Sequence, residues 1–296
     1  MSVGWKKWRK LILPLLFFSA IMIFLDSCMQ FRMSQSEIDE FFAGKKTKGT
    51  LSRYGMGNRV INYLTAGEAN LPLIVFVHGS PGSLSAFIDF MADSVLLKHA
   101  QLISVDRPGF GNSNFGRAEP SLEKQAALLV PILMEHRNQR PIILVGHSLG
   151  GPLIARLAMD YPDLVDGLVM VAPSIDPNLE PHEWYRAPLS TPFLRWLLPR
   201  SLRASNDEIY KLKPELEKLL PLWTKVKAKT IVIQGKKDSL VPWENADFAA
   251  KMISQAKVKL VLVDDMGHFV PWTNPELIRN AVLELVEDLR TEKSSN

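Results

Sequence analysis

The stretch Ile142–Gly151, which reads IILVGHSLGG, decides the fold of this chain. An apolar run of strand length leads directly into the pattern G-x-S-x-G at residues 146–150, and Pro152 follows two residues later. Such a run is typical of a buried parallel strand, and proline is tolerated in the first turn of a helix. The sequence therefore predicts a strand, a sharp turn and a helix, the context in which this serine acts as a nucleophile.

The glycines of this turn have a mechanical reason. A serine held at positive φ between a strand and a helix leaves no room for side chains two residues before or after it, which explains Gly146 and Gly150. Ser148 then projects above the sheet at a helix N-terminus, where the helix dipole favours the negative charge that develops during acyl transfer. We predict that Ser148 is the nucleophile.

The rest of the body alternates between strand-like and helix-like segments, which predicts βαβ units and a mostly parallel sheet in an α/β protein. One segment, residues 176–227, interrupts this alternation with Pro, Trp, Leu and basic residues, and we expect it to form an inserted helical cap. The core then comprises residues 50–175 and 228–296. The predicted strands are 50–54 and 59–64 (a hairpin), 73–77, 102–105, 142–145, 168–171, 230–234 and 259–263; the predicted helices are 84–98, 121–138, 151–160, 245–254 and 275–291.

These features resemble the α/β-hydrolase family over residues 50–291, and the resemblance implies eight strands flanked by helices with a short cap after the sixth. His78-Gly79-Ser80-Pro81-Gly82 is similar to the family's HG-x-PG oxyanion loop. By this resemblance the backbone N–H groups of Ser80 and Leu149 bind the oxyanion, while His78 is structural. Residues 106–113 are similar to the family's D-x-x-G-x-G-x-S turn, which we interpret as structural.

A serine nucleophile of this fold needs a carboxylate and then a histidine later in the chain. Asp238 and His268 follow the last two predicted strands, where the family keeps its acid and its base. Asp176 is an alternative acid, and Asp264 and Asp265 share a loop with His268. The remaining histidines are interpreted as surface or packing residues: His99, His136, His147 and His182.

The cap is rich in apolar residues that either line an acyl pocket or pack the cap on the body. Its arginines face anionic groups or, more simply, solvent. We find no metal cluster and no phosphate-binding loop in the sequence, so no cofactor and no metal site is predicted. The apolar cap residues are Trp184, Tyr185, Phe193, Leu194, Trp196, Leu197, Leu198, Leu219, Leu220, Leu222 and Trp223; the arginines are Arg186, Arg195, Arg200 and Arg203.

The N-terminus has the pattern of a targeting signal. Four basic residues within 6–10 precede an uncharged apolar run of 15 residues, 11–25, which has the length of a signal-peptide core and is shorter than the roughly 20 residues of a spanning helix. Cys28, the only cysteine, follows in a stretch that resembles a bacterial lipobox, although Asp26 departs from that pattern. We predict that residues 1–27 are a lipoprotein signal peptide or a single-pass anchor, with a buried helix as the third alternative, and that residues 28–49 form a connector.

Charge and composition limit the partners. Hydrophobic residues make up 47% of the 296 residues, as in an ordinary folded protein. The net charge is +4, but residues 1–27 contain four basic residues and one acid, so the body carries only +1. We therefore expect no nucleic-acid partner, and a membrane partner through a lipid on Cys28 or through the N-terminal helix.

These observations predict a serine hydrolase at the bacterial cell envelope, with an extracytoplasmic catalytic domain and a small-molecule substrate. An aspartate nucleophile would suit epoxides or haloalkanes, whereas Ser148 supports an acyl-enzyme and a carboxylic ester substrate. The alternatives are an amide, lactone or C–C bond hydrolase, an acyltransferase, or a receptor-like protein with little turnover. The sequence does not predict the oligomeric state.

Overall fold

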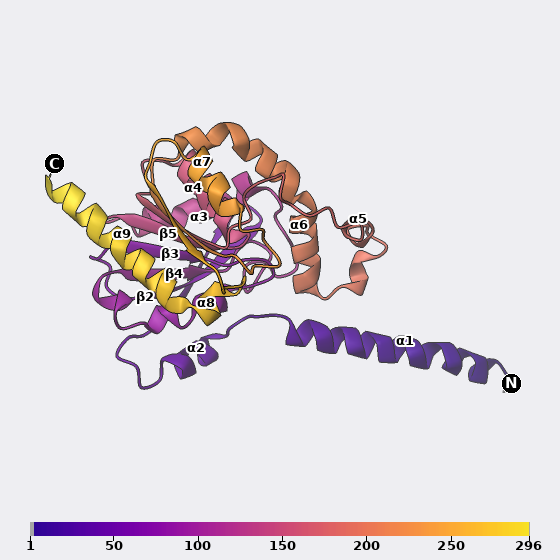
Figure 1. Cartoon of the computed structure of the whole chain (residues 1–296). Helices are drawn as coiled ribbons and strands as arrows, with labels where there is room; N and C mark the ends of the chain where they lie inside the picture. Colours follow the sequence, from indigo (N-terminus) through magenta and orange to yellow (C-terminus); the bar gives the residue numbers. More distant parts are fainter. Residues whose placement is uncertain (1–2, 296) are drawn as a thin grey trace.

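The computed structural model describes residues 3–295 and contains one eight-stranded sheet with helices on both faces (Figure 1). The strand order is β1-β2-β4-β3-β5-β6-β7-β8; β2 is antiparallel to both β1 and β4, and all other neighbours are parallel. The predicted mostly parallel sheet of eight strands is confirmed. The strands are β1 Thr50–Met56, β2 Arg59–Ala66, β3 Leu73–Val77, β4 Gln101–Val105, β5 Ile142–His147, β6 Gly167–Val171, β7 Lys229–Gly235 and β8 Val258–Val263.

The central strands β3 to β6 are buried at every position, because apolar helices cover both faces of the sheet. One core layer lies between the sheet and helices α3, α4 and α7; the other lies under α9, α2 and three short 3-10 turns. The helices are α1 Val3–Cys28, α2 Gln35–Phe42, α3 Leu122–Glu135, α4 Gly150–Asp160, α5 Arg186–Leu189, α6 Arg200–Leu219, α7 Asn245–Met252, α8 Val270–Thr273 and α9 Pro275–Ser295.

The helix expected over residues 84–98 is wrong. The chain forms three 3-10 turns there instead: η1 Leu84–Phe87, η2 Phe90–Ala92 and η3 Leu96–Lys98. The reason is local, because the carboxylate of Asp93 accepts hydrogen bonds from the N–H groups of Val95 (2.8 Å) and Leu96 (3.1 Å). A short polar side chain that bonds nearby backbone groups competes with a continuous helix.

The segment between β6 and β7 is helical and lies beside the carboxyl ends of the strands (Figure 1). It consists of α5, the turn η4 (Arg195–Leu197), the long helix α6 and the turn η5 (Leu220–Lys225). Its two halves differ in burial: Trp223 is fully buried against the core, whereas Trp184 and Phe193 are about four-fifths exposed, at 78% and 80%. We call residues 172–228 the cap segment below.

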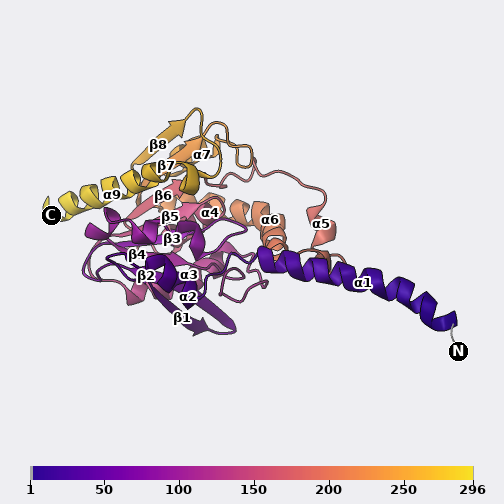
Figure 2. The ribbon, with the colours of Figure 1, turned by 90° about the horizontal axis from the view of Figure 1, so that it is seen from below.

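Helix α1 projects from the body on the side of α5 and α6, as two perpendicular views agree (Figures 1 and 2). At its C-terminal end, Asp26 accepts hydrogen bonds from the backbone N–H of Arg200 (2.6 Å) and from its guanidinium (2.7 Å). Phe18 packs edge-on against Trp196, with ring centroids 5.8 Å apart. None of the helices among residues 3–295 combines the length and the apolarity that a membrane crossing requires.

The connector that follows α1 is held against the body. Ser34 and Glu37 form a reciprocal capping box that starts α2, and Ile38 and Phe42 on α2 are buried in the core. Upstream of α2, the side chain of Asn112 donates to the carbonyl oxygen of Met33 (3.0 Å). Residues 31–42 therefore have a defined position relative to the sheet.

Candidate active site

Ser148 occupies the turn that the sequence predicts. Its φ is +54°, a left-handed conformation that is uncommon for a residue other than glycine, and its N–H donates to the carbonyl oxygen of Val171 (2.9 Å). A Cβ on Gly146 would lie 2.4 Å from the carbonyl oxygen of Gly150, and a Cβ on Gly150 would lie 2.3 Å from that of Val77. Only glycine fits at either position, so the turn holds Ser148 at the end of β5 and the start of α4.

Asp238 and His268 meet at the same edge of the sheet, because the loops after β7 and β8 converge there. Asp238 Oδ2 lies 2.8 Å from His268 Nδ1, and both side chains are buried. The other carboxylate oxygen, Oδ1, accepts the N–H groups of Leu240 (2.9 Å) and Val241 (2.8 Å). The carboxylate thus fixes the imidazole with its proton on Nδ1, which leaves the Nε2 lone pair available.

The electrostatics of Asp238 suit this arrangement. Burial by itself raises the pKa of the carboxyl, but the hydrogen bonds from His268 and from the backbone N–H of Val241 outweigh it and hold the pKa below its ordinary value. Asp238 is therefore ionised at neutral pH and stabilises an imidazolium at His268 when one forms.

Ser148 and His268 line the same two cavities. Within residues 3–295 their side chains are not hydrogen-bonded to each other. Nucleophile–base contacts are often long in ligand-free enzymes and tighten when substrate binds, so the arrangement is compatible with general-base chemistry.

Two backbone N–H groups near Ser148 have no acceptor in the described part of the chain. Neither the N–H of Ser80 nor that of Leu149 donates to an acceptor within residues 3–295, and both residues line the cavity next to Ser148. The loop that carries Ser80 approaches the turn closely, since a Cβ on Gly79 would lie 3.0 Å from the Cβ of Ser148. A pair of free N–H groups beside a serine is the arrangement that binds an oxyanion.

The alternative acids have other partners. Asp176 Oδ1 accepts the N–H of Asn178 (2.9 Å) in a local turn. Asp264 and Asp265 are more than four-fifths exposed and form ion pairs with Lys236 (2.8 Å) and Lys237 (2.5 Å). Among the contacts of residues 3–295, Asp238 is the carboxylate that touches His268.

His147, interpreted from the sequence as a surface or packing residue, contacts the predicted base His268. Its Nε2–H donates to the carbonyl oxygen of His268 (2.9 Å), and the two rings lie 4.8 Å apart. Burial, and then the proximity of His268, lower the pKa of His147 to about 3, so the ring is neutral at physiological pH. No sequence pattern reports this contact, because it joins β5 to a loop 121 residues away.

A buried ion pair links the oxyanion loop to the cap segment, and sequence reasoning missed it. The guanidinium of Arg107, at 0% exposure, binds both carboxylate oxygens of Glu208 on α6, at 2.9 and 3.0 Å. Arg107 also donates to the carbonyl oxygens of His78 (2.9 Å) and Gly79 (3.0 Å), and Ser80 Oγ donates to Glu208 (3.0 Å). The turn at residues 106–113 therefore positions the oxyanion loop.

Two cavities meet at Ser148. The first, about 410 Å³, lies under the cap segment; the second, about 600 Å³, lies on the other side of the oxyanion loop. Of the aromatic cap residues, Tyr185 lines the first cavity and Trp223 packs in the core, whereas Trp184, Phe193 and Trp196 are more than half exposed. The first cavity is instead closed mainly by aliphatic residues: Leu189, Leu198, Leu202, Ile209 and Leu212.

Two of the cap arginines form ion pairs with carboxylates rather than facing solvent alone. Arg195 pairs with Asp207 (2.8 Å), and Arg200 pairs with Asp26. In the described part of the chain, no group of three or more His, Cys, Asp or Glu side chains is placed to hold a metal ion.

Comparisons with known proteins agree on the fold. A family model described as the alpha/beta hydrolase fold matches residues 72–204. Protein NDRG4 of Xenopus tropicalis is 35% identical over 133 residues, which cover 42% of this chain and 32% of that protein. The sn-1-specific diacylglycerol lipase ABHD11 of Mus musculus is 35% identical over 108 residues, which cover 36% of this chain and 34% of that protein. The match thus spans about a third of the length of these curated relatives.

A solved structure that covers nearly the whole chain has the same architecture. The crystal structure of a membrane phospholipase A, described as a bacterial virulence factor, superimposes with a TM-score of 0.63 at 17% identity and covers 96% of this chain and 99% of that one. The matching family model, the strand order and this similarity show that the chain has the α/β-hydrolase fold.

Proposed function

We propose that this α/β-hydrolase-fold protein is a serine hydrolase that cleaves a carboxylic ester through an acyl-enzyme. The observation that carries the proposal is the Asp238–His268 pair at 2.8 Å, which lines one cavity together with a serine held at positive φ and with two residues whose backbone N–H groups are free. Nucleophile, base, orienting carboxylate and oxyanion site are the four parts that acyl transfer needs.

Each residue then has a defined step. Ser148 Oγ attacks the carbonyl carbon while its proton passes to His268 Nε2, and the oxyanion that forms is bound by the N–H groups of Ser80 and Leu149. The C–O bond to the alcohol breaks, and the departing oxygen takes the proton from His268. Water then attacks the acyl-enzyme by the same route, which releases the acid and restores Ser148.

The first cavity is proposed to hold an apolar acyl or aryl group. Its aliphatic lining under the cap segment suits a hydrocarbon chain, and its 410 Å³ lies in the range of small-molecule sites. Two similar proteins carry lipid-cleaving names, a diacylglycerol lipase and a phospholipase A. The same triad can also cleave an amide, a lactone or a C–C bond, or transfer the acyl group to an acceptor other than water. The assay below therefore decides among these reactions.

The assay is hydrolysis of nitrophenyl esters from acetate to long acyl chains by the full chain in detergent. We expect multiple turnovers that disappear in Ser148→Ala. Asp238→Asn should lower kcat by about 10³- to 10⁴-fold, because the imidazole loses its orienting carboxylate, whereas Asp176→Asn is the matched control and should leave kcat unchanged.

Absence of turnover on every ester would reject ester hydrolysis. Labelling of Ser148 by a fluorophosphonate would then redirect the search to amides, C–C bonds or a receptor-like role, in which a ligand stabilises the protein without being consumed. Fluorophosphonate labelling that persists in Ser148→Ala would reject Ser148 as the nucleophile.

We also propose that the protein is tethered at the bacterial envelope by a lipid on Cys28, with the catalytic body outside the cytoplasm. The support is the apolar run at residues 11–25 after a basic segment, and an exposed Cys28 thiol at the end of α1. Growth with labelled palmitate should label the wild type and not Cys28→Ala. An unlabelled wild type would refute the lipid anchor and leave the retained helix as the tether.

A further inference from the structure

We propose that the N-terminal connector forms one wall of the active site, and that Phe31 determines which alcohol half of an ester the enzyme accepts. The observation is that the second cavity beside Ser148 is bounded by Phe31, a residue more than 100 positions away in the sequence and three residues after Cys28. This inference rests on the proposed ester hydrolysis and adds a substrate class to it.

The side of the site on which this cavity lies identifies what it holds. In acyl transfer the leaving oxygen must accept the proton of His268 Nε2, so the alcohol lies on the His268 side of Ser148. His268 borders both cavities, but the rings that surround it, His147 at 4.8 Å and Phe269 at 5.7 Å between ring centroids, line the second cavity only. The first cavity lies under the cap segment and includes Leu149 and Ser174. The first cavity therefore receives the acyl group and the second the alcohol.

The chemistry of the second cavity favours an apolar alcohol. Four of its side chains are large, apolar and about half exposed, so they lack a protein partner over much of their surface: Phe31 (44%), Leu240 (57%), Phe269 (57%) and Trp272 (53%). Burying this surface against a hydrocarbon or aromatic alcohol is favourable by the hydrophobic effect. The cavity, at about 600 Å³, is large enough for an aromatic or branched alkyl alcohol.

Phe31 is fixed in place by the loop that carries the oxyanion residue. Its carbonyl oxygen accepts hydrogen bonds from the hydroxyls of Ser83 and Ser85 (3.1 Å for Ser85), three and five residues after Ser80. Its φ is +53°, which a bulky residue adopts only where its surroundings hold it. The hydrogen bond from Asn112 to Met33 and the burial of Ile38 and Phe42 secure the chain downstream. The aromatic ring is thereby held at the cavity as a wall.

The test separates the two halves of the substrate. With acetyl as the constant acyl group, naphthyl acetate is compared with ethyl acetate; with nitrophenol as the constant alcohol, octanoate is compared with acetate. Phe31→Ala in the full chain should lower kcat/KM for naphthyl acetate about tenfold, the low end for loss of an apolar contact in a pocket. It should leave ethyl acetate within about twofold, and the octanoate-to-acetate ratio unchanged.

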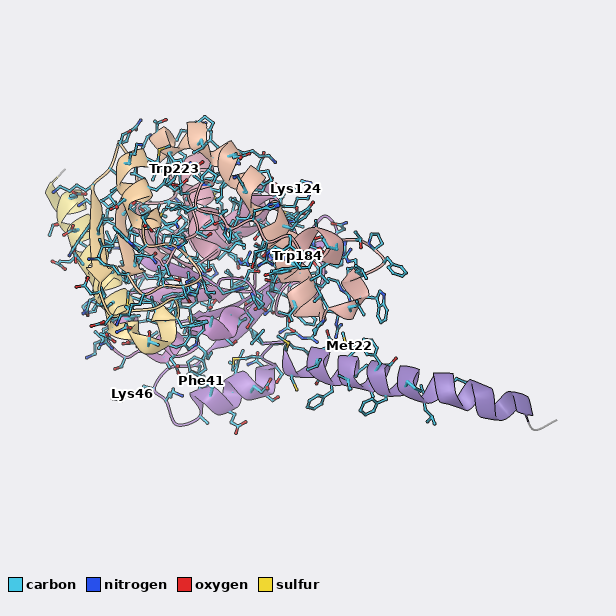
Figure 3. All side chains as sticks on the ribbon, turned by 45° about the vertical axis from the view of Figure 1, so that its right-hand side comes forward. Met22, Phe41, Lys46, Lys124, Trp184 and Trp223 are labelled. Carbon is cyan, nitrogen blue, oxygen red and sulfur yellow. The ribbon has the colours of Figure 1, made fainter. Side chains whose placement is uncertain are left out.

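Two further variants give the comparison its controls. Phe31→Leu keeps an apolar wall and should restore most of the naphthyl acetate activity. Phe41→Ala removes a ring on α2 of the same connector (Figure 3) that is not among the residues lining either cavity, and should behave as the wild type. A uniform loss on all four esters in Phe31→Ala would refute the specificity role, as would equal activity on naphthyl acetate.

A binding measurement makes the inference independent of turnover. Naphthol, the alcohol half alone, should bind the wild-type chain, and Phe31→Ala should raise its Kd about tenfold, measured by naphthol fluorescence. If naphthol binds both proteins equally, or binds neither, the connector does not form the alcohol site. That outcome is distinct from failure of the proposed function, in which no ester is turned over whatever the state of Phe31.

Discussion

Removal of Glu208 tests whether the buried ion pair holds the cap segment and the oxyanion loop together. Glu208→Ala deletes a carboxylate whose side chain is 1% exposed and leaves the Arg107 guanidinium, at 0% exposure, without its counter-charge. It also removes the acceptor of Gln125 Nε2 (3.0 Å) and of Ser80 Oγ (3.0 Å). Breaking a buried pair on one side costs about 3–5 kcal/mol, because the remaining charge is desolvated and unpaired.

That cost sets the expected change in thermal stability. A loss of 1 kcal/mol lowers the Tm of a domain of this size by roughly 2–4 °C, so Glu208→Ala should lower the Tm by about 6–20 °C. The measurement is thermal unfolding followed by circular dichroism at neutral pH, together with the urea midpoint. Glu217→Ala is the matched control, because Glu217 lies on the same helix and is exposed.

The double variant Arg107→Ala/Glu208→Ala distinguishes the charge from the packing. Removing both partners abolishes the unpaired buried charge, so the double variant should be less destabilised than the sum of the two single variants. A Tm for Glu208→Ala within 2 °C of that for Glu217→Ala, or strict additivity in the double variant, would contradict the role assigned to this pair.

Three further predictions concern the core and the site. His147 has a pKa of about 3 in the folded protein against an ordinary value of 6.5, so the unfolded chain takes up a proton first as the pH falls. The free energy of unfolding should therefore be highest above pH 6.5 and decline toward pH 3, by at most about 5 kcal/mol. In urea unfolding at several pH values, His147→Gln should reduce this pH dependence. Gly150→Ala places a Cβ 2.3 Å from the carbonyl oxygen of Val77 and should abolish fluorophosphonate labelling, and normal labelling would show that the turn tolerates a side chain. Trp223→Ala, in a fully buried site, should cost about 3–5 kcal/mol in chemical unfolding, whereas Phe193→Ala, 80% exposed, should change stability by less than about 0.5 kcal/mol; similar values for the two would refute the burial argument.

Local patterns carried most of the fold. The central strands are continuous apolar runs, and their order along the chain between turn residues was enough to predict a mostly parallel sheet. The segment at 84–98 failed because its apolar spacing is helical, while the side chain of Asp93 competes for the backbone N–H groups that a helix needs. The spacing of apolar residues does not show whether a side-chain hydrogen bond will replace the backbone hydrogen bonds of a helix turn.

The candidate site also contains residues that local motifs predict and residues that they do not. Ser148, Asp238 and His268 each follow a strand in a recognisable motif, so chain order was enough to predict that they gather at one edge of the sheet, where Asp238 contacts His268 and Ser148 shares a cavity with it. The contacts of His147, Glu208 and Phe31 join segments that are 121, 101 and 52 residues or more apart, and no local pattern marks them. The sequence leaves the role of the cap aromatics open for a related reason: an apolar residue on a short helix has the same pattern whether it faces a pocket, the core or solvent.

The contact between Asp26 and α6 would couple the proposed signal cleavage to the active site. Helix α6 begins at Arg200 and has no side-chain cap of its own; the carboxylate that accepts the Arg200 N–H belongs to α1. Cleavage ahead of Cys28 would take that carboxylate away, and loss of an N-cap costs about 0.5–2 kcal/mol. The same helix carries Glu208 to the oxyanion loop. A chain that lacks residues 1–27 should therefore be cut more readily by a protease at the start of α6 than a chain that retains α1, so limited proteolysis would distinguish the two forms.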